Sequence, residues 1–166
     1  MSQISTFRIL ANVAAAASGD FDSGGTASLH TDVRLAGGTG ADQADRVAFD
    51  QSTLATSATD NIDLQTATFT PGGAALGLVE LRAFAIKADS NNEDNIEVSP
   101  GSSNGFTSIL ADASDKLIVA PGTTVVLVCP KDGKYPVSGT NKVISVTNAS
   151  SSATATYSLL LVGTSA

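Results

Sequence analysis

The chain has 166 residues, of which 42% are hydrophobic and 15% charged, and its formal net charge is −7. This length favours one domain that buries its own core, with a charged fraction below the usual ~25%. The acidic balance argues against nucleic-acid binding, because phosphate backbones are held by Lys and Arg, and the nine basic residues are scattered along the chain.

Short runs with the two-residue period of half-buried strands dominate the first half of the chain. The predicted strands there cover 4–10, 26–35, 45–54, 61–69 and 77–88. The last of these carries apolar residues on both parities, with Ala83 and Ala85 on one and Phe84 and Ile86 on the other. We therefore expect both faces of that strand to be covered.

The second half continues in the same way. The predicted strands are 95–99, 105–110, 115–120, 123–129, 141–148 and 153–163. Residues 123–129 form a continuous apolar run, which is typical of a central strand packed on both sides. The connections contain Pro and Gly, as in "PGG" and "PGT", and the Asp132-Gly133 pair is a hairpin signal.

We predict an all-β protein, an antiparallel β-sandwich or jelly roll of about ten strands, because no helical crossovers separate the strands. Residues 26–166 would form this single domain, and residues 1–25 an N-terminal strand or extended arm. The Ala-rich segment 11–20 leaves two possibilities open, a helical turn or an extended arm that runs to a neighbouring molecule.

The most polar stretch is "ADSNNEDNIEVSPGSSNGF", which follows the strand 77–88. Counted from Asp89, it does not match an EF-hand loop, because Asp94 stands where Gly is needed and Pro100 where Glu is needed. Two interpretations remain. The stretch is an exposed hairpin turn rich in Asn and Asp, or it holds calcium in another way through Asp89, Asp94 and nearby carbonyls.

Catalytic patterns are missing. Cys129 and His30 are the only residues of their kinds and lie about a hundred positions apart, so we interpret Cys129 as a buried structural thiol. The glycines of "GGTGAD" (37–42) lack the Lys-Ser/Thr and the helix of a phosphate loop. We predict no enzymatic activity, no cofactor and no metal.

Membrane and export signals are also missing from the pattern. No apolar run approaches the ~20 residues that cross a bilayer. The opening "MSQISTFRIL" lacks the basic leader and apolar core of a signal peptide. The sequence predicts a soluble protein that is made in the cytosol and has no membrane partner.

Three segments carry a resemblance to a known group. They are "GGTGADQADRVAFDQSTLATSATDNIDL" (37–64), "ELRAFAIKADSNNEDNIEVSPGSSNGFTSIL" (80–110) and "VAPGTTVVLVCPKDGKYPVSGTNKVISVTNASSSATATYSLLLVGTS" (119–165). Their cadence resembles small proteins encoded among the head genes of tailed bacteriophages. The chain departs from that cadence at "APGT" and at "YSLLLVG".

The resemblance implies a virion structural protein, of the capsid decoration or cement type, and no chemistry. It implies synthesis in the host cytoplasm, a place on the outer surface of the capsid, and binding to the major capsid protein and to itself as a trimer or dimer. The candidate contact residues are Phe7, Arg8, Leu10, Gly38, Thr39, Phe106 and Tyr135, in the N-terminal segment, the "GGTG" loop and the loops 100–106 and 131–139.

Three other functions stay open. One is a tail, neck or head-fibre component of the same virion. Another is a carbohydrate-binding β-sandwich module in which the acidic loop holds calcium. The last is a small hydrolase, against which the missing pairing of histidine and nucleophile weighs.

Overall fold

The computed structural model describes residues 5–14, 26–70 and 72–166, which are built from strands and turns. The strands are β1 (Ser5–Ala14), β2 (Thr26–Gly37), β3 (Gln43–Ala44), β4 (Arg46–Leu54), β5 (Thr59–Asp63), β6 (Glu80–Ala88), β7 (Ile96–Pro100), β8 (Leu117–Val119), β9 (Thr124–Val128), β10 (Val143–Asn148) and β11 (Ala155–Thr164). The predicted all-β fold is confirmed. In these ranges no helix is long and apolar enough to cross a membrane.

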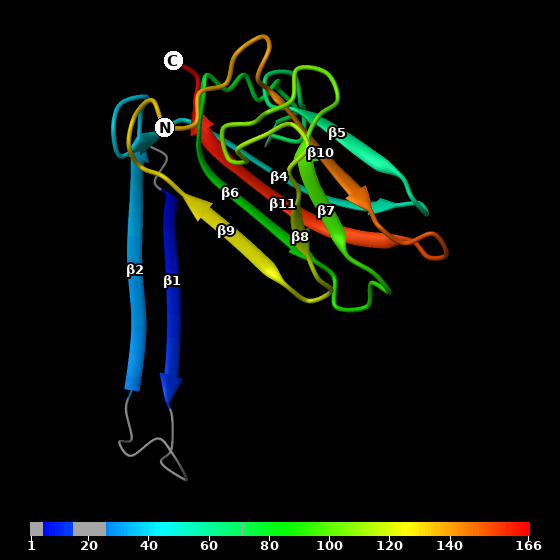
Figure 1. Cartoon of the computed structure of the whole chain (residues 1–166). Coiled ribbons are helices and arrows are strands. Elements are labelled where there is room, and N and C mark those ends of the chain that lie inside the picture. The colour runs from blue at the N-terminus through cyan, green and yellow to red at the C-terminus, as the bar shows by residue number, and fades with distance from the viewer. Residues whose placement is uncertain (1–4, 15–25, 71) are drawn as a thin grey trace.

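Eight of the strands form a sandwich of two four-stranded antiparallel sheets (Figure 1). One sheet has the order β5-β10-β7-β8 and the other the order β4-β11-β6-β9. Strands pair from the outside of the sequence inwards: β4 with β11, β5 with β10, β6 with β9 and β7 with β8. This is one long hairpin wrapped into two sheets, which is the jelly-roll topology.

The main core lies between the two sheets. Alternate residues of the central strands point into it, such as Leu159 and Leu161 on β11 and Phe84 and Ile86 on β6, and each is at most 1% exposed. Burying a side chain of this size stabilises the fold by roughly 1.5–3 kcal/mol relative to leaving it exposed. The two-residue periods in the sequence therefore correspond to real inner and outer faces.

The prediction that 123–129 forms a central strand is wrong. β9 is an edge strand of its sheet, and its residues after the exposed Thr124 are half-buried. This segment is apolar at both odd and even positions because both of its faces pack against apolar residues. Val125 and Leu127 contact the main core, while Val128 contacts a second apolar cluster on the outer face of the sheet.

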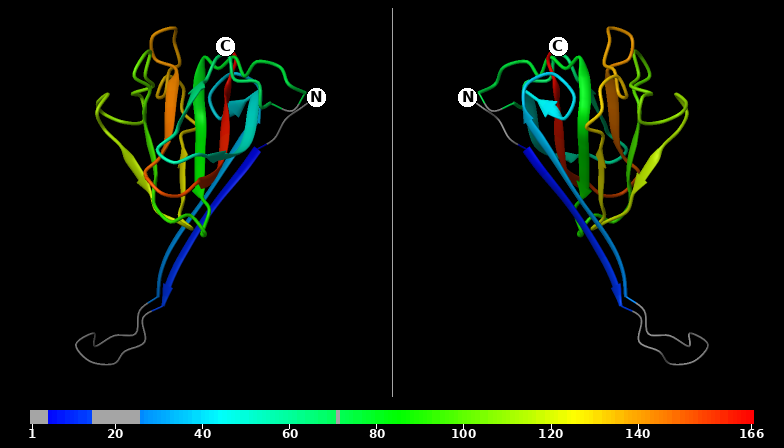
Figure 2. Two further views of the ribbon diagram at one scale, coloured as in Figure 1. Left: turned by 90° about the vertical axis from the view of Figure 1, so that its right-hand side faces the viewer. Right: turned by 90° about the vertical axis from the view of Figure 1, so that its left-hand side faces the viewer.

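β1 and β2 form a long antiparallel hairpin, here called the arm, whose register runs from Ser5 opposite Leu35 to Ala14 opposite Thr26. The arm leaves the sandwich and projects beyond it (Figure 2). Residues 26–35 were predicted to belong to the sandwich domain, but in the structure they pair with β1 in the arm. Of the Ala-rich segment, 11–14 is strand and 15–20 lies outside the described residues.

Two other predicted strands differ from the structure. In the segment 61–69, β5 ends at Asp63, whose Oδ1 accepts hydrogen bonds from the backbone amides of Gln65 and Thr66 and closes a turn. The segment 105–110 forms turns, with a single bridge from Gly105 to Val143. In both segments, a local side-chain or loop contact takes the place of the strand pairing that the alternating apolar pattern predicted.

Candidate interaction surfaces

Arg82 is the least expected residue of the sandwich, because it is fully buried on an apolar strand. The register between β6 and β11 shifts at this point: Ala83 pairs with Val162, but Leu81 pairs with Gly163. Arg82 is therefore the extra residue of a β-bulge, a feature that redirects a side chain. The bulge allows the charged side chain of Arg82 to be accommodated on a strand whose neighbouring residues pack into the core.

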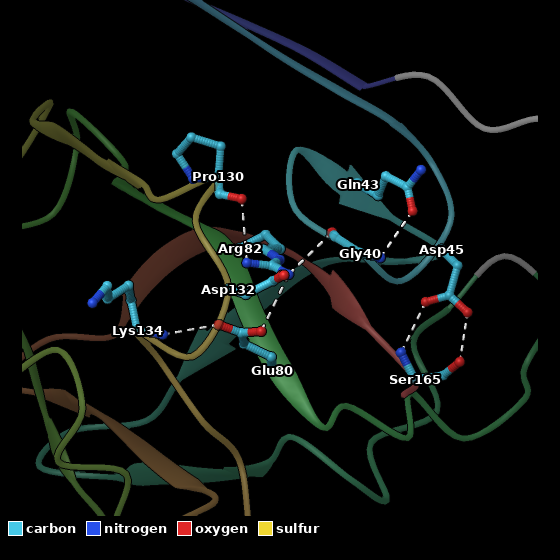
Figure 3. Close-up of polar contacts among 9 residues, drawn as sticks. All are labelled: Gly40, Gln43, Asp45, Glu80, Arg82, Pro130, Asp132, Lys134 and Ser165. Carbon is cyan, nitrogen blue, oxygen red and sulfur yellow. Dashed lines mark hydrogen bonds and ion pairs between the residues drawn. The ribbon is translucent and has the colours of Figure 1, made fainter.

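The Arg82 guanidinium joins three segments that are far apart in the sequence (Figure 3). Nη1 donates to the carbonyl oxygen of Pro130 at 3.3 Å, and Nη2 donates to that of Gly40 at 3.2 Å. Glu80 Oε2, 3.2 Å away, and the carboxylate of Asp132 balance its charge. A buried charge is tolerated only with such partners, and removing one of them is strongly destabilising.

Further bonds fasten the "GGTG" loop at the base of the arm. The amide of Asp42 donates to the carbonyl oxygen of Pro130 at 2.9 Å, and Gln43 Oε1 accepts from the amide of Gly40 at 2.8 Å. Gly38 has a φ of 143°, and a side chain there would collide with the Gln43 amide. The predicted contact residues Gly38 and Thr39 thus belong to a firmly held loop, with Thr39 exposed.

A second polar link ties the loop 131–139 to the loop after β7. Asn141 Oδ1 accepts from the amide of Thr107 at 2.8 Å, and its Nδ2 donates to the carbonyl oxygen of Pro136 at 2.8 Å. Together with Arg82, this link connects three loops, 38–42, 130–136 and 104–108. We call this linked set the loop end.

The predicted contact residues Tyr135 and Phe106 of the loop end differ in how deeply they are buried. Tyr135 is half-buried and packs partly against the main core. Phe106 is only 1% exposed and belongs to the main core, which corrects its assignment as a surface contact. The turn residues that surround Phe106 suggested exposure, but the loop folds this ring inwards over the end of the sandwich.

The remaining predicted contact residues, Phe7, Arg8 and Leu10, lie on β1. They occupy register positions opposite Val33, Asp32 and His30 of β2, respectively. The structure therefore places them on the arm.

A surface that sequence reasoning missed is the outer face of the sheet β4-β11-β6-β9. At the base of the arm, Leu35 is fully buried there against Ala83 and Val162, with Val33 packed beside them. Farther along this face lies a groove of about 320 Å³ lined by Phe49, Ala85, Ile86, Lys87, Thr124, Ser158, Leu159 and Leu160. Phe49 is 59% exposed. The sequence pattern could have indicated this apolar face, because Val47 and Phe49 are two positions apart on β4 and therefore lie on the same face of the strand.

The acidic loop connects β6 to β7, which lie in different sheets, so it crosses between sheets and does not form a hairpin tip. Asn92 holds it in place by exchanging hydrogen bonds with the backbone of Thr156, at 2.8 and 3.0 Å. Asp89 and Asp94 accept hydrogen bonds from neighbouring amides. No group of three or more His, Cys, Asp or Glu residues that could hold a metal ion occurs within the described ranges.

A polar groove of about 340 Å³ lies beside β5 and is lined by Asp50, Asp60, Asn61, Ile62, Asp63, Thr66, Ala67, Thr68, Phe69 and Tyr157. The hydroxyl of Tyr157 donates to Asp60 Oδ2 at 3.0 Å. Burial, this hydrogen bond and the negative charges of Asp60 and Asp50 raise the pKa of Tyr157 above its ordinary value. The phenol therefore stays protonated and acts as a donor.

The two residues considered as a catalytic pair lie on different parts of the fold. Cys129 follows β9 and is half-buried, and its amide donates to the carbonyl oxygen of Arg82 at 2.8 Å. His30 lies on β2, in the arm.

No protein-family model and no curated protein matches this chain.

Proposed function

We propose that this chain is a virion structural protein, a capsid decoration protein that binds the lattice of the major capsid protein and stabilises the head. The cadence of residues 37–165 supports this proposal, and so does the low charge of the chain, because the cores of protein interfaces are depleted in charged residues. The fold does not choose between functions, since jelly rolls occur in capsid proteins and in lectins alike.

The observation that carries the proposal is the arm. At about 3.3 Å per residue, its ten paired positions span about 33 Å. A two-stranded hairpin is at best marginally stable by itself, and most of the arm projects away from a sandwich that already has a complete core (Figure 2). Such a ribbon is suited to contacts with neighbouring molecules in an assembly.

The loop end is the surface that we expect to face the capsid. Its loops converge through Arg82 and Asn141, so their backbones are held before any partner binds, which lowers the entropy cost of association. Exposed Thr39 and half-buried Tyr135 lie in this set. A repeating lattice turns many modest contacts of this kind into firm attachment through multivalency.

The test begins with purified particles of the phage that encodes the chain. A density map with quantitative mass spectrometry should find the chain on the outer shell in hundreds of copies. A handful of copies at one vertex would favour the tail, neck or head-fibre alternative. Complete absence from purified particles would overturn both virion proposals.

A binding assay then tests the loop end itself. Shells that lack the chain should bind added wild-type protein, and Thr39→Arg should weaken this binding by at least tenfold. Thr53→Arg is the matched control, because Thr53 is an exposed threonine on β4, outside the loop end. Equal binding of the two variants would contradict the assignment of the contact surface.

A second candidate function is carbohydrate binding, favoured by the polar groove beside β5. Carboxylates of Asp50 and Asp60, the amide of Asn61 and the ring of Phe69 line it, and these groups are the kinds that bind sugar hydroxyls and apolar sugar faces. A glycan array should then show binding that Asn61→Ala abolishes. No binding to any glycan on the array would dismiss this candidate.

A further inference from the structure

The loop between β7 and β8 contains Asn104-Gly105, the one position in the sequence at which Gly follows Asn. In this dipeptide the amide nitrogen of Gly can attack the side-chain carbonyl carbon of Asn, because the second residue has no Cβ that shields the nitrogen or restricts the backbone. The attack displaces ammonia and closes a five-membered succinimide ring. Its rate depends on the side chain, the nitrogen and the backbone at this position.

The side chain of Asn104 is open to this attack. It is exposed to solvent, and it makes no hydrogen bond to any residue that the structure describes. Other asparagines differ in this respect, because the side chains of Asn92, Asn141 and Asn148 each make at least two hydrogen bonds. No side-chain contact therefore holds the reacting carbon of Asn104 away from the backbone.

The attacking nitrogen of Gly105 is not engaged either. Gly105 forms a bridge to Val143, but its own N–H is not part of that bridge. The amide of Phe106 donates to the carbonyl oxygen of Val143 at 2.8 Å, and the amide of Val143 donates to that of Asn104 at 2.9 Å. In the part of the chain that the structure describes, the amide of Gly105 has no acceptor, so no hydrogen bond has to break at the nitrogen itself.

The packing of the loop requires Gly at position 105. A Cβ there would collide with the carbonyl oxygen of Gly101 and lie 2.8 Å from Cβ of Pro100. A side chain is therefore excluded by its surroundings, since real Cβ atoms do not approach other atoms so closely. The fold itself requires the residue that leaves Asn104 reactive.

The backbone of Asn104 opposes the reaction. Its φ of 52° is that of the left-handed region, in which the next amide nitrogen lies on the opposite side of the Cα–C bond from Cβ. Ring closure needs the two on the same side, so the Cα–C bond must rotate. The carbonyl oxygen of Asn104 accepts from the amides of Lys142 at 2.8 Å and Val143 at 2.9 Å, and this rotation breaks both bonds. The native loop therefore protects Asn104, and local opening of the loop exposes it to reaction.

We propose that Asn104 is a site of spontaneous deamidation, and that the hydrogen bonds of the loop end control its rate. When the loop opens, the nitrogen of Gly105 bonds to Cγ of Asn104 as the bond from Cγ to the side-chain nitrogen breaks. That nitrogen leaves as ammonia and takes the proton of the Gly105 amide. A water molecule then opens the succinimide at one of its two carbonyl carbons. The product is aspartate, or isoaspartate with the main chain running through the former side chain.

Both products change the surface of the loop end. Each adds a negative charge beside a groove of about 310 Å³ that Asp63, Asn104 and Lys142 help to line. Isoaspartate also lengthens the main chain by one carbon next to Gly105, so we expect it to disturb the bonds from the amides of Lys142 and Val143 and to lower the melting temperature. The inference concerns the covalent state of the chain and does not depend on capsid binding.

The first test incubates the purified full chain at pH 8, folded in buffer and unfolded in urea, and follows each asparagine by mass spectrometry of its peptides. In urea, Asn104 should convert before Asn95, which is followed by Ile. In the folded chain, Asn104 should convert at least tenfold more slowly than in urea. Conversion of Asn95 as fast as Asn104 in urea would overturn the site, and equal rates at Asn104 in folded and unfolded chains would overturn the control by the loop.

A matched pair of variants tests which bonds control the rate. Asn141→Ala removes the bonds that Asn141 makes to the amide of Thr107 and the carbonyl oxygen of Pro136, within the loop end. Asn92→Ala removes two bonds to the backbone of Thr156, outside it. Only Asn141→Ala should speed the conversion of Asn104 severalfold in the folded chain, with melting temperatures verifying that both variants are folded. Equal rates for the two variants would show that the loop end does not control the reaction.

The Asn104→Asp variant separates the effect of the added charge from that of the longer main chain. Ion exchange resolves the aged chain into its unmodified and modified forms, and enzymatic methylation of isoaspartate identifies the form that contains it. We expect Asn104→Asp to melt close to the wild type, because position 104 is exposed, and the isoaspartate form to melt below both. Equal melting temperatures of Asn104→Asp and the isoaspartate form would contradict the role given to the main-chain bonds. A chain that never deamidates but is abundant on virions would refute this inference alone and leave the proposed function standing.

Discussion

The Nη2 of Arg82, on β6, donates a hydrogen bond to the carbonyl oxygen of Gly40 at 3.2 Å, although the two residues lie 42 positions apart. This bond connects the centre of a sandwich sheet to the loop that follows the arm. The position and rigidity of the arm base therefore depend on a buried charge.

Replacing Arg82 with Met should destabilise the fold by about 3–5 kcal/mol, because the carboxylates of Glu80 and Asp132 and two carbonyls lose their common partner. Hydrogen exchange should accelerate most at the amide of Asp42, which bonds to Pro130 in the same cluster. Lys87→Met on the same strand is the control, since Lys87 is exposed, and it should change stability by less than about 0.5 kcal/mol. Similar unfolding midpoints for the two variants would contradict this role.

Gly163 should not tolerate even a methyl group. A Cβ at this position would lie 2.1 Å from the carbonyl oxygen of Glu80 and 2.8 Å from Leu78 Cδ2. Gly163→Ala should therefore cost about 1–3 kcal/mol through overpacking at the bulge. Gly139→Ala is the control, because a Cβ there has no neighbour within 4 Å. Chemical denaturation measures both, and an unchanged Gly163→Ala midpoint would contradict the close approach.

Phe106→Ala should cost about 3–5 kcal/mol, as expected for removing a ring from a core. The residue is 1% exposed, so the variant should lose stability with no specific loss of binding to shells once measured well below its melting temperature. Thr39→Ala should behave in the opposite way, with near-wild-type stability, because Thr39 is exposed in the loop end. Stability of Phe106→Ala equal to wild type would contradict its place in the core.

Asp63 should make part of the stability depend on pH. Burial raises the pKa of its carboxyl, but the hydrogen bond from Lys142 Nζ at 2.8 Å and those from the amides of Gln65 and Thr66 outweigh burial and hold the pKa below its usual 3.8. A lowered folded-state pKa gives stability that is present above the unfolded pKa, about 4, and lost as the pH falls through the folded value.

The matching variant is Asp63→Asn, which keeps the Oδ1 acceptor and removes the charge. Its melting temperature at pH 7 should lie below that of the wild type, and the two proteins should converge near pH 2. A constant difference between them across this pH range would show that the ion pair with Lys142 is not its source.

The strand positions and the class of fold follow from local information. Alternation at 45–54, 77–88 and 141–148 reports which residues lie on opposite faces, and it located β4, β6 and β10 to within a few residues. Gly and Pro between the runs mark where the chain turns. The absence of helical periods then leaves an antiparallel arrangement as the consistent architecture.

Which strands pair could not be predicted in this way, because β7 and β8 are the only consecutive strands of the sandwich that are hydrogen-bonded to each other. An apolar run such as 123–129 is compatible with a central strand or with an edge strand that has a covered outer face, and only the folded arrangement distinguishes them. The same holds for Arg82. In the sequence it is one of nine scattered basic residues, and only the bulge opposite Gly163 explains its burial. Most strands, the alternation of their two faces and the turns between them follow from neighbouring residues, although 105–110 forms turns instead of the predicted strand. The tertiary structure alone decided which strands meet, that Phe106 enters the core, and that Phe49 remains on an open sheet face beside the arm, since these depend on contacts between distant parts of the chain.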